Sequence, residues 1–171
     1  DKTKAIYVNS PSNPTGGVLT RKDLEAIAAL AQEKNLWVIS DEAYEDVVFE
    51  GEQISMASLP GMYERTIPLY TFSKTYAATG VRVGYLAARD ERLRDRLQKI
   101  LFLTTSNVSS ISQYGAVGAL EGPQDVVEQY RRLGIRGEEA CGNRLDGLGR
   151  GLVLDGTQGA CVAFVARRHQ R

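Results

Sequence analysis

The chain has 171 residues, and its 21 lysines and arginines balance 21 aspartates and glutamates. Zero net charge gives no sign of a nucleic acid or an anionic membrane surface as partner. Two cysteines and one histidine are too few for a disulfide framework, a zinc site or a histidine-based triad. No apolar run approaches membrane-spanning length and no signal peptide opens the chain, so we expect a cytoplasmic protein without a metal.

The ends of the sequence predict a piece of a longer protein. Asp1 is not an initiating methionine, and a predicted strand begins almost at once, at Ala5. Residues 159–171 have the pattern of a short apolar strand followed by a basic stub. We therefore expect a fragment whose parent protein continues beyond the printed sequence.

The first part of the chain has the pattern of a βαβ unit. Residues 5–8 and 36–39 are short apolar runs typical of buried parallel strands, and a turn-rich loop follows the first. Between them, Thr20 and Asp23 form a capping-box-like pair, and Asn35 can close the helix. One helical face carries Leu24, Ile27, Ala28 and Ala31. Such a unit takes a right-handed crossover by default.

The pattern continues with strands at 67–72 and 81–88, a helix capped by Asp90, and a helix at 106–120. The helix after Asp90 would carry on one face Leu93, Leu97, Ile100 and Leu101. From Pro123 the prediction weakens, because a short apolar helical pattern gives way to a glycine-rich stretch at 134–158. That stretch is either a broken helix or loosely ordered.

Asp41, Tyr44 and Lys74 follow the apolar runs of predicted strands. Binding and active sites often lie at the carboxyl ends of the strands in an α/β sheet. A lysine there can form a Schiff base with an aldehyde cofactor, and an aspartate can hold a pyridinium nitrogen. Each residue taken singly also has a purely structural interpretation. Lys74 could be a surface lysine, Asp41 a helix-capping aspartate and Tyr44 a packed core tyrosine. Glu42, next to Asp41, is expected to be solvated or structural.

Further polar residues complete a possible cofactor site. The amide of Asn13, in the turn-forming NPTG at 13–16, can donate to a cofactor ring oxygen and a substrate carboxylate. The Asn13–Pro14 bond is a candidate cis peptide that would aim this amide. The hydroxyls of Thr71 and Ser73, with the guanidinium of Arg82, form a donor set suited to a phosphate dianion. No glycine-rich nucleotide-binding motif is present.

In this order the motifs are specific as a set: NPTG at 13–16, DEAY at 41–44 and TFSKTYAATGVRVGY at 71–85. The chain resembles the large domain of class I/II aminotransferases, the fold-type-I pyridoxal-phosphate enzymes, from about residue 5 to residue 120. The resemblance implies an α/β fold with three αβα layers and a mostly parallel sheet, here incomplete.

The resemblance also implies roles for individual residues. Lys74 matches the Schiff-base lysine, Asp41 the pyridinium partner and Tyr44 the tyrosine at the ring oxygen; these three are the expected catalytic residues. Asn13 matches the asparagine that touches the ring oxygen and the substrate. The expected phosphate contacts are Thr71, Ser73 and Arg82. Amino acid and 2-oxo acid substrates, and a homodimer for the complete protein, follow from the same resemblance.

Three segments are expected from this comparison. Residues 1–122 would form part of the domain that binds pyridoxal phosphate, 123–158 an interdomain helical segment, and 159–171 the start of a small C-terminal domain. The glycine-rich phosphate turn, the ring-stacking aromatic residue and the carboxylate-binding arginine of the family fall outside the printed sequence. We therefore expect the isolated chain to bind the cofactor weakly and to turn over poorly.

The main functional hypothesis is transfer of an amino group between an amino acid and a 2-oxo acid. A carbon–sulfur or related lyase of the same fold is the alternative within the family, because the same lysine and pyridinium serve both reactions. A non-catalytic pyridoxal-phosphate-binding sensing domain and a plain α/β binding module are the alternatives from other classes.

Overall fold

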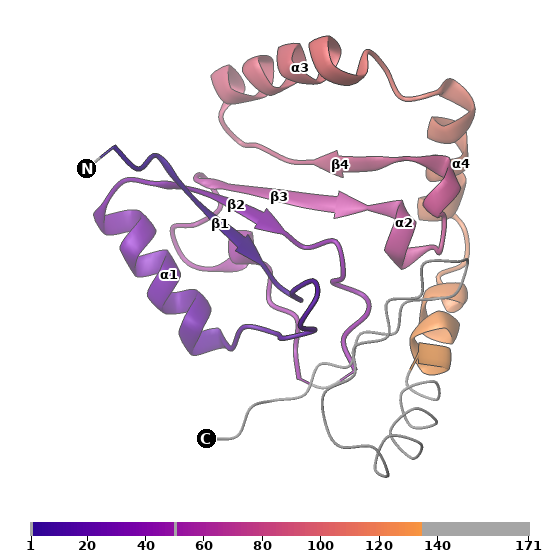
Figure 1. Cartoon of the computed structure of the whole chain (residues 1–171), viewed down its shortest axis with the longest axis horizontal. Coiled ribbons are helices and arrows are strands. Elements are labelled where there is room, and N and C mark those ends of the chain that lie inside the picture. The colour runs from indigo at the N-terminus through magenta and orange to yellow at the C-terminus, as the bar shows by residue number, and fades with distance from the viewer. Residues whose placement is uncertain (1, 50, 135–171) are drawn as a thin grey trace.

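The computed structural model describes residues 2–49 and 51–134. Its centre is a four-stranded sheet in the order β1-β2-β3-β4. Strands β1 (Ala5–Asn9), β2 (Trp37–Asp41) and β3 (Thr66–Thr71) are parallel, and β4 (Gly84–Leu86) runs antiparallel to β3. Figure 1 shows the arrowheads of β1, β2 and β3 pointing toward the same side of the sheet. The predicted α/β class with a mostly parallel sheet is confirmed.

Helix α1 (Arg21–Glu33) connects β1 to β2 as the sequence predicts. Its capping box is present: the Thr20 side chain accepts from the Asp23 N–H, and the Asp23 carboxylate accepts from the Thr20 N–H. Asn35 has a positive φ of 49° just past the end of the helix, a conformation that asparagine tolerates well. Local signals therefore set both ends of this helix.

The main core lies between α1 and one face of the sheet. Leu24, Ala28 and Ala31 of α1 are buried, and they pack with Val8 of β1 and Val38 of β2. The other buried members of this cluster come from the strand approaches and from the segment around the 3₁₀ turn η1 (Met56–Ser58): Leu36, Met56, Leu59 and Met62. The hydrophobic face predicted for α1 is thus the face that attaches it to the sheet.

Strand β3 leads directly into the short helix α2 (Phe72–Thr75), which carries Lys74. A 3₁₀ turn, η2 (Thr79–Val81), then returns the chain to β4. The strand expected at 81–88 is therefore shorter than predicted. Arg82, with φ 55° in the left-handed region, ends η2 and redirects the backbone before pairing with β3 can begin. Phe72 and Val83 form a second small core with Ala116.

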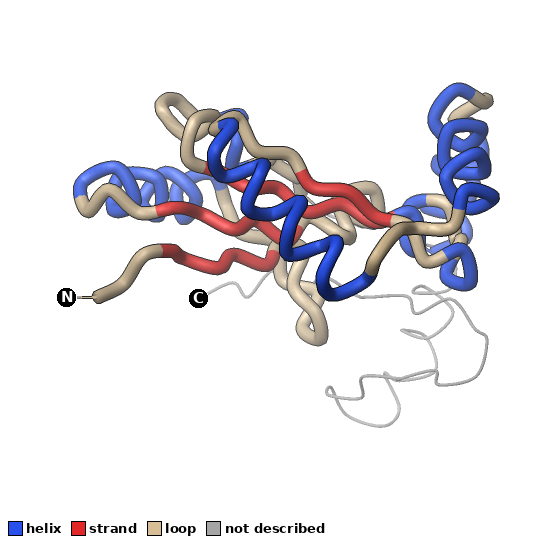
Figure 2. Tube along the Cα trace, turned by 90° about the horizontal axis from the view of Figure 1, so that it is seen from above, coloured by secondary structure: helices blue, strands red, loops and turns tan. Residues whose placement is uncertain are grey.

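Helix α3 (Glu91–Thr105) begins at Asp90, whose side chain accepts from the Leu93 N–H. This helix lies beyond β4 in Figure 1 and crosses in front of the strands in Figure 2. The helix is confirmed, but it has no buried residue. Ile100 and Leu101, which were expected on an inward face, are 56% and 46% exposed. No element of the described chain covers this part of α3.

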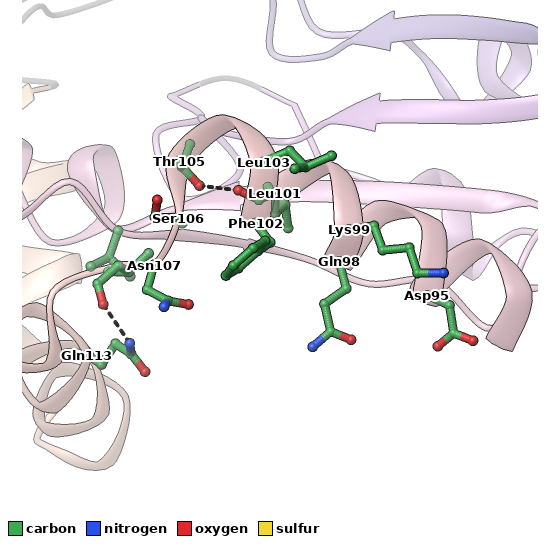
Figure 3. A pocket seen from close by; sticks show the side chains of 13 residues that line it. Asp95, Gln98, Lys99, Leu101, Phe102, Leu103, Thr105, Ser106, Asn107 and Gln113 are labelled. Carbon is green, nitrogen blue, oxygen red and sulfur yellow. Dashed lines mark hydrogen bonds between the residues drawn. The ribbon is translucent and has the colours of Figure 1, made fainter.

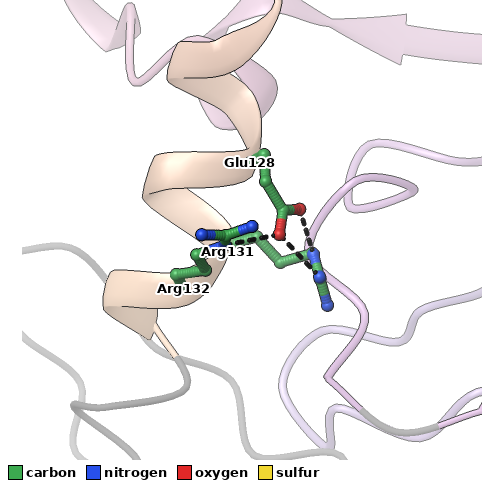
Figure 4. Close-up of polar contacts among 3 residues, drawn as sticks. All are labelled: Glu128, Arg131 and Arg132. Atoms are coloured by element: carbon green, nitrogen blue, oxygen red, sulfur yellow. Dashed lines mark hydrogen bonds and ion pairs between the residues drawn. The ribbon is translucent and has the colours of Figure 1, made fainter.

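Helix α4 (Ser110–Glu121) follows, and the chain is helical again from 125 to 134. On this last helix, Glu128 accepts two hydrogen bonds from Arg131 and one from Arg132 (Figure 4). These contacts lower the pKa of Glu128 to about 2. Pairs at this spacing stabilise a helix modestly. The helical pattern predicted after Pro123 is confirmed as far as residue 134.

The predicted segment boundaries at 122/123 and 158/159 stay predictions. Residues 135–171, which include most of the glycine-rich stretch and the strand expected from residue 159, lie outside the described residues. Within the described ranges, no helix combines the length and apolar character needed to cross a bilayer.

Gly84 provides a test of the pairing between β3 and β4. A Cβ at this position would lie 2.6 Å from the backbone oxygen of Tyr70, whereas a Cβ at Gly80 would meet no atom within 4 Å. We expect Gly84→Ala to lower the free energy of unfolding by about 1–3 kcal/mol, because the backbone must shift. Gly80→Ala should change it by less than about 1 kcal/mol. Urea denaturation of both variants measures the difference, and equal effects would contradict the close approach.

Candidate active site

The parallel register brings the carboxyl ends of three strands into one row. Asn9 pairs with Asp41, and Asp41 pairs with Leu69. Each strand then continues into a segment that carries predicted site residues: the loop with Asn13, the turn with Tyr44, and α2 with Lys74. These segments leave the sheet on the side to which the arrowheads of β1, β2 and β3 point in Figure 1.

The loop after β1 is fixed to its neighbours by Ser10, which is buried. Its N–H donates to the backbone oxygen of Asp41 at 3.2 Å, and its hydroxyl accepts from the Leu19 N–H at 3.0 Å. The side chain of Gln53 donates to the Ser10 carbonyl at 3.1 Å. The Asn13–Pro14 bond is cis, as predicted. The loop that carries Asn13 is thus attached directly to the end of β2.

Tyr44 joins two of the predicted residues. The amide nitrogen of Asn13 lies 3.5 Å from the Tyr44 hydroxyl, to which it donates. The ammonium nitrogen of Lys74 lies 5.2 Å from the centroid of the Tyr44 ring, within the range of a cation–π contact. Tyr44 itself is buried, with 9% exposure. Asn13, 31 positions before Tyr44, and Lys74, 30 positions after it, therefore both contact this tyrosine.

Asp41 is held at both carboxylate oxygens. The hydroxyl of Tyr7 donates to Oδ2 at 2.5 Å, and the N–H of Ala43 donates to Oδ1 at 3.2 Å. Tyr7 was not among the residues selected from the sequence. Its position two residues before Asn9 on β1 places it on the same face as Asp41, since side chains alternate along a strand. The alternation of side chains along the strand is the sequence signal that could have placed Tyr7 near Asp41.

Thr71, Ser73 and Arg82 also come together. The Thr71 hydroxyl caps α2 by accepting from the Ser73 N–H at 3.2 Å. One terminal nitrogen of Arg82 donates to the Ser73 hydroxyl at 3.5 Å and to the Thr79 carbonyl at 3.0 Å. The short helix and the turn η2 thus present two hydroxyls and one guanidinium as a group, although α2 alone is too short to bind an anion through its dipole.

Glu42 is the most deeply buried charged side chain among the described residues, with 1% exposure. Its Oε1 accepts from the Ser40 and Ser55 hydroxyls at 2.8 and 3.0 Å and from the Met56 N–H at 3.2 Å. Its Oε2 accepts from the Tyr70 hydroxyl at 3.2 Å. The structural interpretation of Glu42 is therefore confirmed and the solvated one is wrong, because four donors hold the carboxylate inside the protein.

Glu45 lies half-buried one turn further on. Its desolvation is the main reason that its pKa is raised from 4.5 to about 7, with repulsion from Asp46 and Glu42 as lesser causes. Burial raises the pKa of Tyr70, and the negative charges of Glu42 and Glu45 add to the shift. A carboxyl group that changes charge near neutral pH thus sits in the turn that carries Tyr44.

A pocket of about 840 Å³ opens elsewhere, between the start of β4 and helix α3 (Figure 3). Figure 3 shows Asp95, Gln98 and Phe102 projecting from the same side of α3. None of the residues predicted for the site lines this pocket. Its walls combine exposed apolar side chains of α3 with polar ones, including Lys99 and Ser106. The strand ends remain the better candidate, because Lys74, Tyr44 and Asn13 meet there.

A smaller pocket, of about 550 Å³, adjoins the strand ends. It is lined by Thr75, which follows Lys74, and by Glu45 and Asp46. The Thr75 hydroxyl donates to Asp46 at 2.8 Å, and the Tyr76 hydroxyl donates to Gln124 at 3.0 Å on the opposite wall. The segment that carries Lys74 is thereby connected to the turn that precedes the last described helix.

Comparison with known proteins agrees with this fold. The family model for class I and II aminotransferases matches residues 1–166. The aromatic-amino-acid aminotransferase 2 of Thermococcus litoralis is 44% identical over 151 residues, which is 86% of this chain and 39% of that protein. The aspartate aminotransferase of Bacillus sp. (strain YM-2) is 43% identical over 134 residues, or 77% of this chain and 34% of that protein.

Solved structures give the same result. The aromatic aminotransferase of Pyrococcus horikoshii OT3 matches with a TM-score of 0.80 and 41% identity, covering 86% of this chain and 40% of that one. A double mutant of Thermus thermophilus aspartate aminotransferase matches with a TM-score of 0.79 and 33% identity, covering 86% and 38%. The chain belongs to the class I and II aminotransferase family, and it spans about two fifths of the length of these relatives.

The buried carboxylate of Glu42 generates the first prediction for this region. Glu42→Ala should lower the free energy of unfolding by about 3 kcal/mol, because buried donors lose their acceptor. Glu25→Ala, on the exposed face of α1, should change it by less than about 0.5 kcal/mol. Urea denaturation measures both. Similar losses for the two variants would show that the Glu42 network contributes little.

Glu45 generates a prediction about pH. The folded protein keeps this proton up to about pH 7, whereas the unfolded chain releases it near pH 4.5. Folding therefore takes up a proton between these values, and the contribution of Glu45 to stability falls as the pH rises. Glu45→Gln should remove this fall, so its advantage over the unchanged protein should grow from pH 4.5 to pH 7.

The measurement is urea denaturation across that pH range, with Glu52→Gln as the matched control. Glu52 is an exposed carboxylate of the same loop, and its loss should not produce a pH-dependent gain in stability. An advantage of Glu45→Gln that is independent of pH would contradict the raised pKa.

Proposed function

We propose that the protein to which this chain belongs is a pyridoxal-phosphate-dependent aminotransferase that moves an amino group between an amino acid and a 2-oxo acid. The observation that carries the proposal is the meeting of Lys74, Tyr44 and Asn13 at the carboxyl ends of parallel strands. Membership of the aminotransferase family supports it. Since the chain covers 39% of a relative named as an aromatic-amino-acid aminotransferase, the activity of the whole protein is inferred from its part.

The chemistry of the side chains fits pyridoxal phosphate. The cofactor would supply an aldehyde that condenses with amines and a ring that accepts electrons from a substrate carbanion. The matching groups of this chain are an amine at Lys74, a carboxylate at Asp41, and a phenol and an amide at Tyr44 and Asn13. Each lies at the carboxyl end of one of the three parallel strands or in the segment that follows it.

Lys74 and Tyr44 would act at the reacting end of the site. The Lys74 amine would bind the cofactor in the resting protein and, once released by substrate, move a proton to and from the substrate Cα. The Tyr44 phenol would donate to the ring oxygen, and Asn13 would orient that phenol and hold the substrate carboxylate. The 3.5 Å contact between Asn13 and Tyr44 supports their acting together.

Asp41 would stay ionised beside the ring nitrogen and keep that nitrogen protonated, which favours electron withdrawal from the substrate. Thr71, Ser73 and Arg82 would hold the phosphate. The Arg82 guanidinium would supply the positive charge, and the two hydroxyls would donate hydrogen bonds that orient the phosphate. The 3.5 Å contact between Arg82 and Ser73 supports a shared anion site.

The proposal extends to the complete protein: a homodimer, as the family resemblance implies, located in the cytoplasm. Sedimentation of the full-length protein would test the dimer. The identity of the substrate is left to experiment, because the relatives include proteins named for aromatic amino acids and for aspartate.

Reduction with borohydride in the presence of pyridoxal phosphate tests the role of Lys74. We expect the chain to acquire a pyridoxyl group on Lys74 in preference to Lys34, an exposed lysine paired with Glu33. At limiting cofactor concentration, the amount of Lys74 adduct should exceed that of the Lys34 adduct by more than about tenfold. Only the proposed site has side chains that can contact both the phosphate and the ring of the cofactor. Peptide mapping by mass spectrometry measures the ratio.

Lys34→Arg is the control variant and should leave labelling of Lys74 unchanged, whereas Lys74→Arg should abolish the preferred adduct. Equal labelling of Lys74 and Lys34 would contradict the proposal. With the full-length protein, an amino acid and a 2-oxo acid, exchange of the amine supports a transaminase, and release of ammonia would indicate the lyase alternative.

A further inference from the structure

We propose that Tyr7 is a positioning residue of this site: its hydroxyl holds the Asp41 carboxylate in place for the ring nitrogen of the cofactor. The inference rests on the proposed function and adds to it a residue outside the three sequence motifs. It concerns a side chain on β1, before the loop that carries Asn13.

The strand register places Tyr7 beside Asp41. Tyr7 pairs with Ile39 and Asn9 pairs with Asp41, so Tyr7 and Asp41 are diagonal neighbours on one face of two parallel strands. A long aromatic side chain can span such a diagonal. The distance of 2.5 Å from the Tyr7 hydroxyl to Asp41 Oδ2 shows that it does so here.

The contact fixes the carboxylate together with a second donor. The Ala43 N–H bonds Oδ1 at 3.2 Å while Tyr7 bonds Oδ2, so rotation of the carboxylate would break at least one bond. An ionised carboxylate offers about four acceptor positions, and these two donors leave about half of them for a protonated ring nitrogen. The arrangement restrains Asp41 without saturating it.

Tyr7 remains a donor over the whole physiological range. Its hydrogen bond to Asp41 is the largest cause that raises its pKa to about 12, followed by desolvation and the negative charge of Asp41. Its side chain is otherwise 60% exposed within the described structure. Packing therefore gives little reason for a tyrosine here, whereas the bond to Asp41 requires its hydroxyl.

The test compares Tyr7→Phe with Tyr63→Phe in the 171-residue chain. Tyr63 is a matched control, because it is 62% exposed and precedes β3 at the opposite end of that strand from Lys74. The dissociation constant for pyridoxal phosphate is measured from the absorbance of the bound cofactor. We expect Tyr7→Phe to weaken binding by about three- to tenfold, the range of an ordinary net hydrogen bond, because Tyr7 acts only through Asp41, and Tyr63→Phe by less than about twofold.

A second arm shows whether Tyr7 acts through Asp41. In the Asp41→Asn background, Tyr7→Phe should change the dissociation constant by less than about twofold, because the carboxylate it positions is gone. A separate measurement needs no cofactor: NMR titration of the Tyr7 phenol should show that Asp41→Asn lowers its pKa from about 12.

The outcomes separate the two ideas. If Tyr7→Phe binds like the unchanged chain while Lys74 is still labelled, the positioning role is overturned and the proposed function stands. The positioning role is also overturned if Tyr7→Phe weakens cofactor binding equally with and without the Asp41 carboxylate. It is overturned as well if the Tyr7 pKa does not change in Asp41→Asn. If Lys74 of the unchanged chain takes no pyridoxyl group, the proposed function fails and the role of Tyr7 fails with it.

Discussion

The buried carboxylate of Glu42 is the constraint on which the geometry of the strand ends depends. A charge inside a protein is tolerated only where donors surround it, and Glu42 receives donors from β2, from β3 and from the segment that begins η1. It directly follows Asp41 in the chain, so anchoring one acidic residue inside the protein determines where the other leaves the sheet. Tyr44, two residues further, is carried by the same turn.

The candidate site is built by convergence. Parallel strands end at one edge of a sheet, and three of them bring an amide, a carboxylate, a phenol and an amine to that edge from segments far apart in the sequence. In the turn behind them, burial raises the pKa of Glu45, and repulsion from Asp46 and Glu42 adds to the shift. The polar residues of the candidate site thus lie next to the buried polar network of Glu42.

Helix α3 forms although none of its residues is buried. Its cap at Asp90 and its composition specify a helix, yet side chains such as Leu103 are 81% exposed, and a pocket of about 840 Å³ lies along it. The relatives extend well beyond the part that this chain matches. Secondary structure in this region is therefore specified locally, while the burial of its apolar residues is not provided by the described chain.

The sequence by itself determined the elements whose signals are local: the capping box at Thr20, the apolar face of α1, and the caps at Asn35 and Asp90. Family motifs in the sequence also selected the residues of the candidate site. Only the tertiary structure decided that Glu42 is buried and that Tyr7 bonds Asp41, because each depends on strand register and on partners 28 and 34 residues away. It also decided that the strand expected at 81–88 is short, since the left-handed backbone at Arg82 delays pairing.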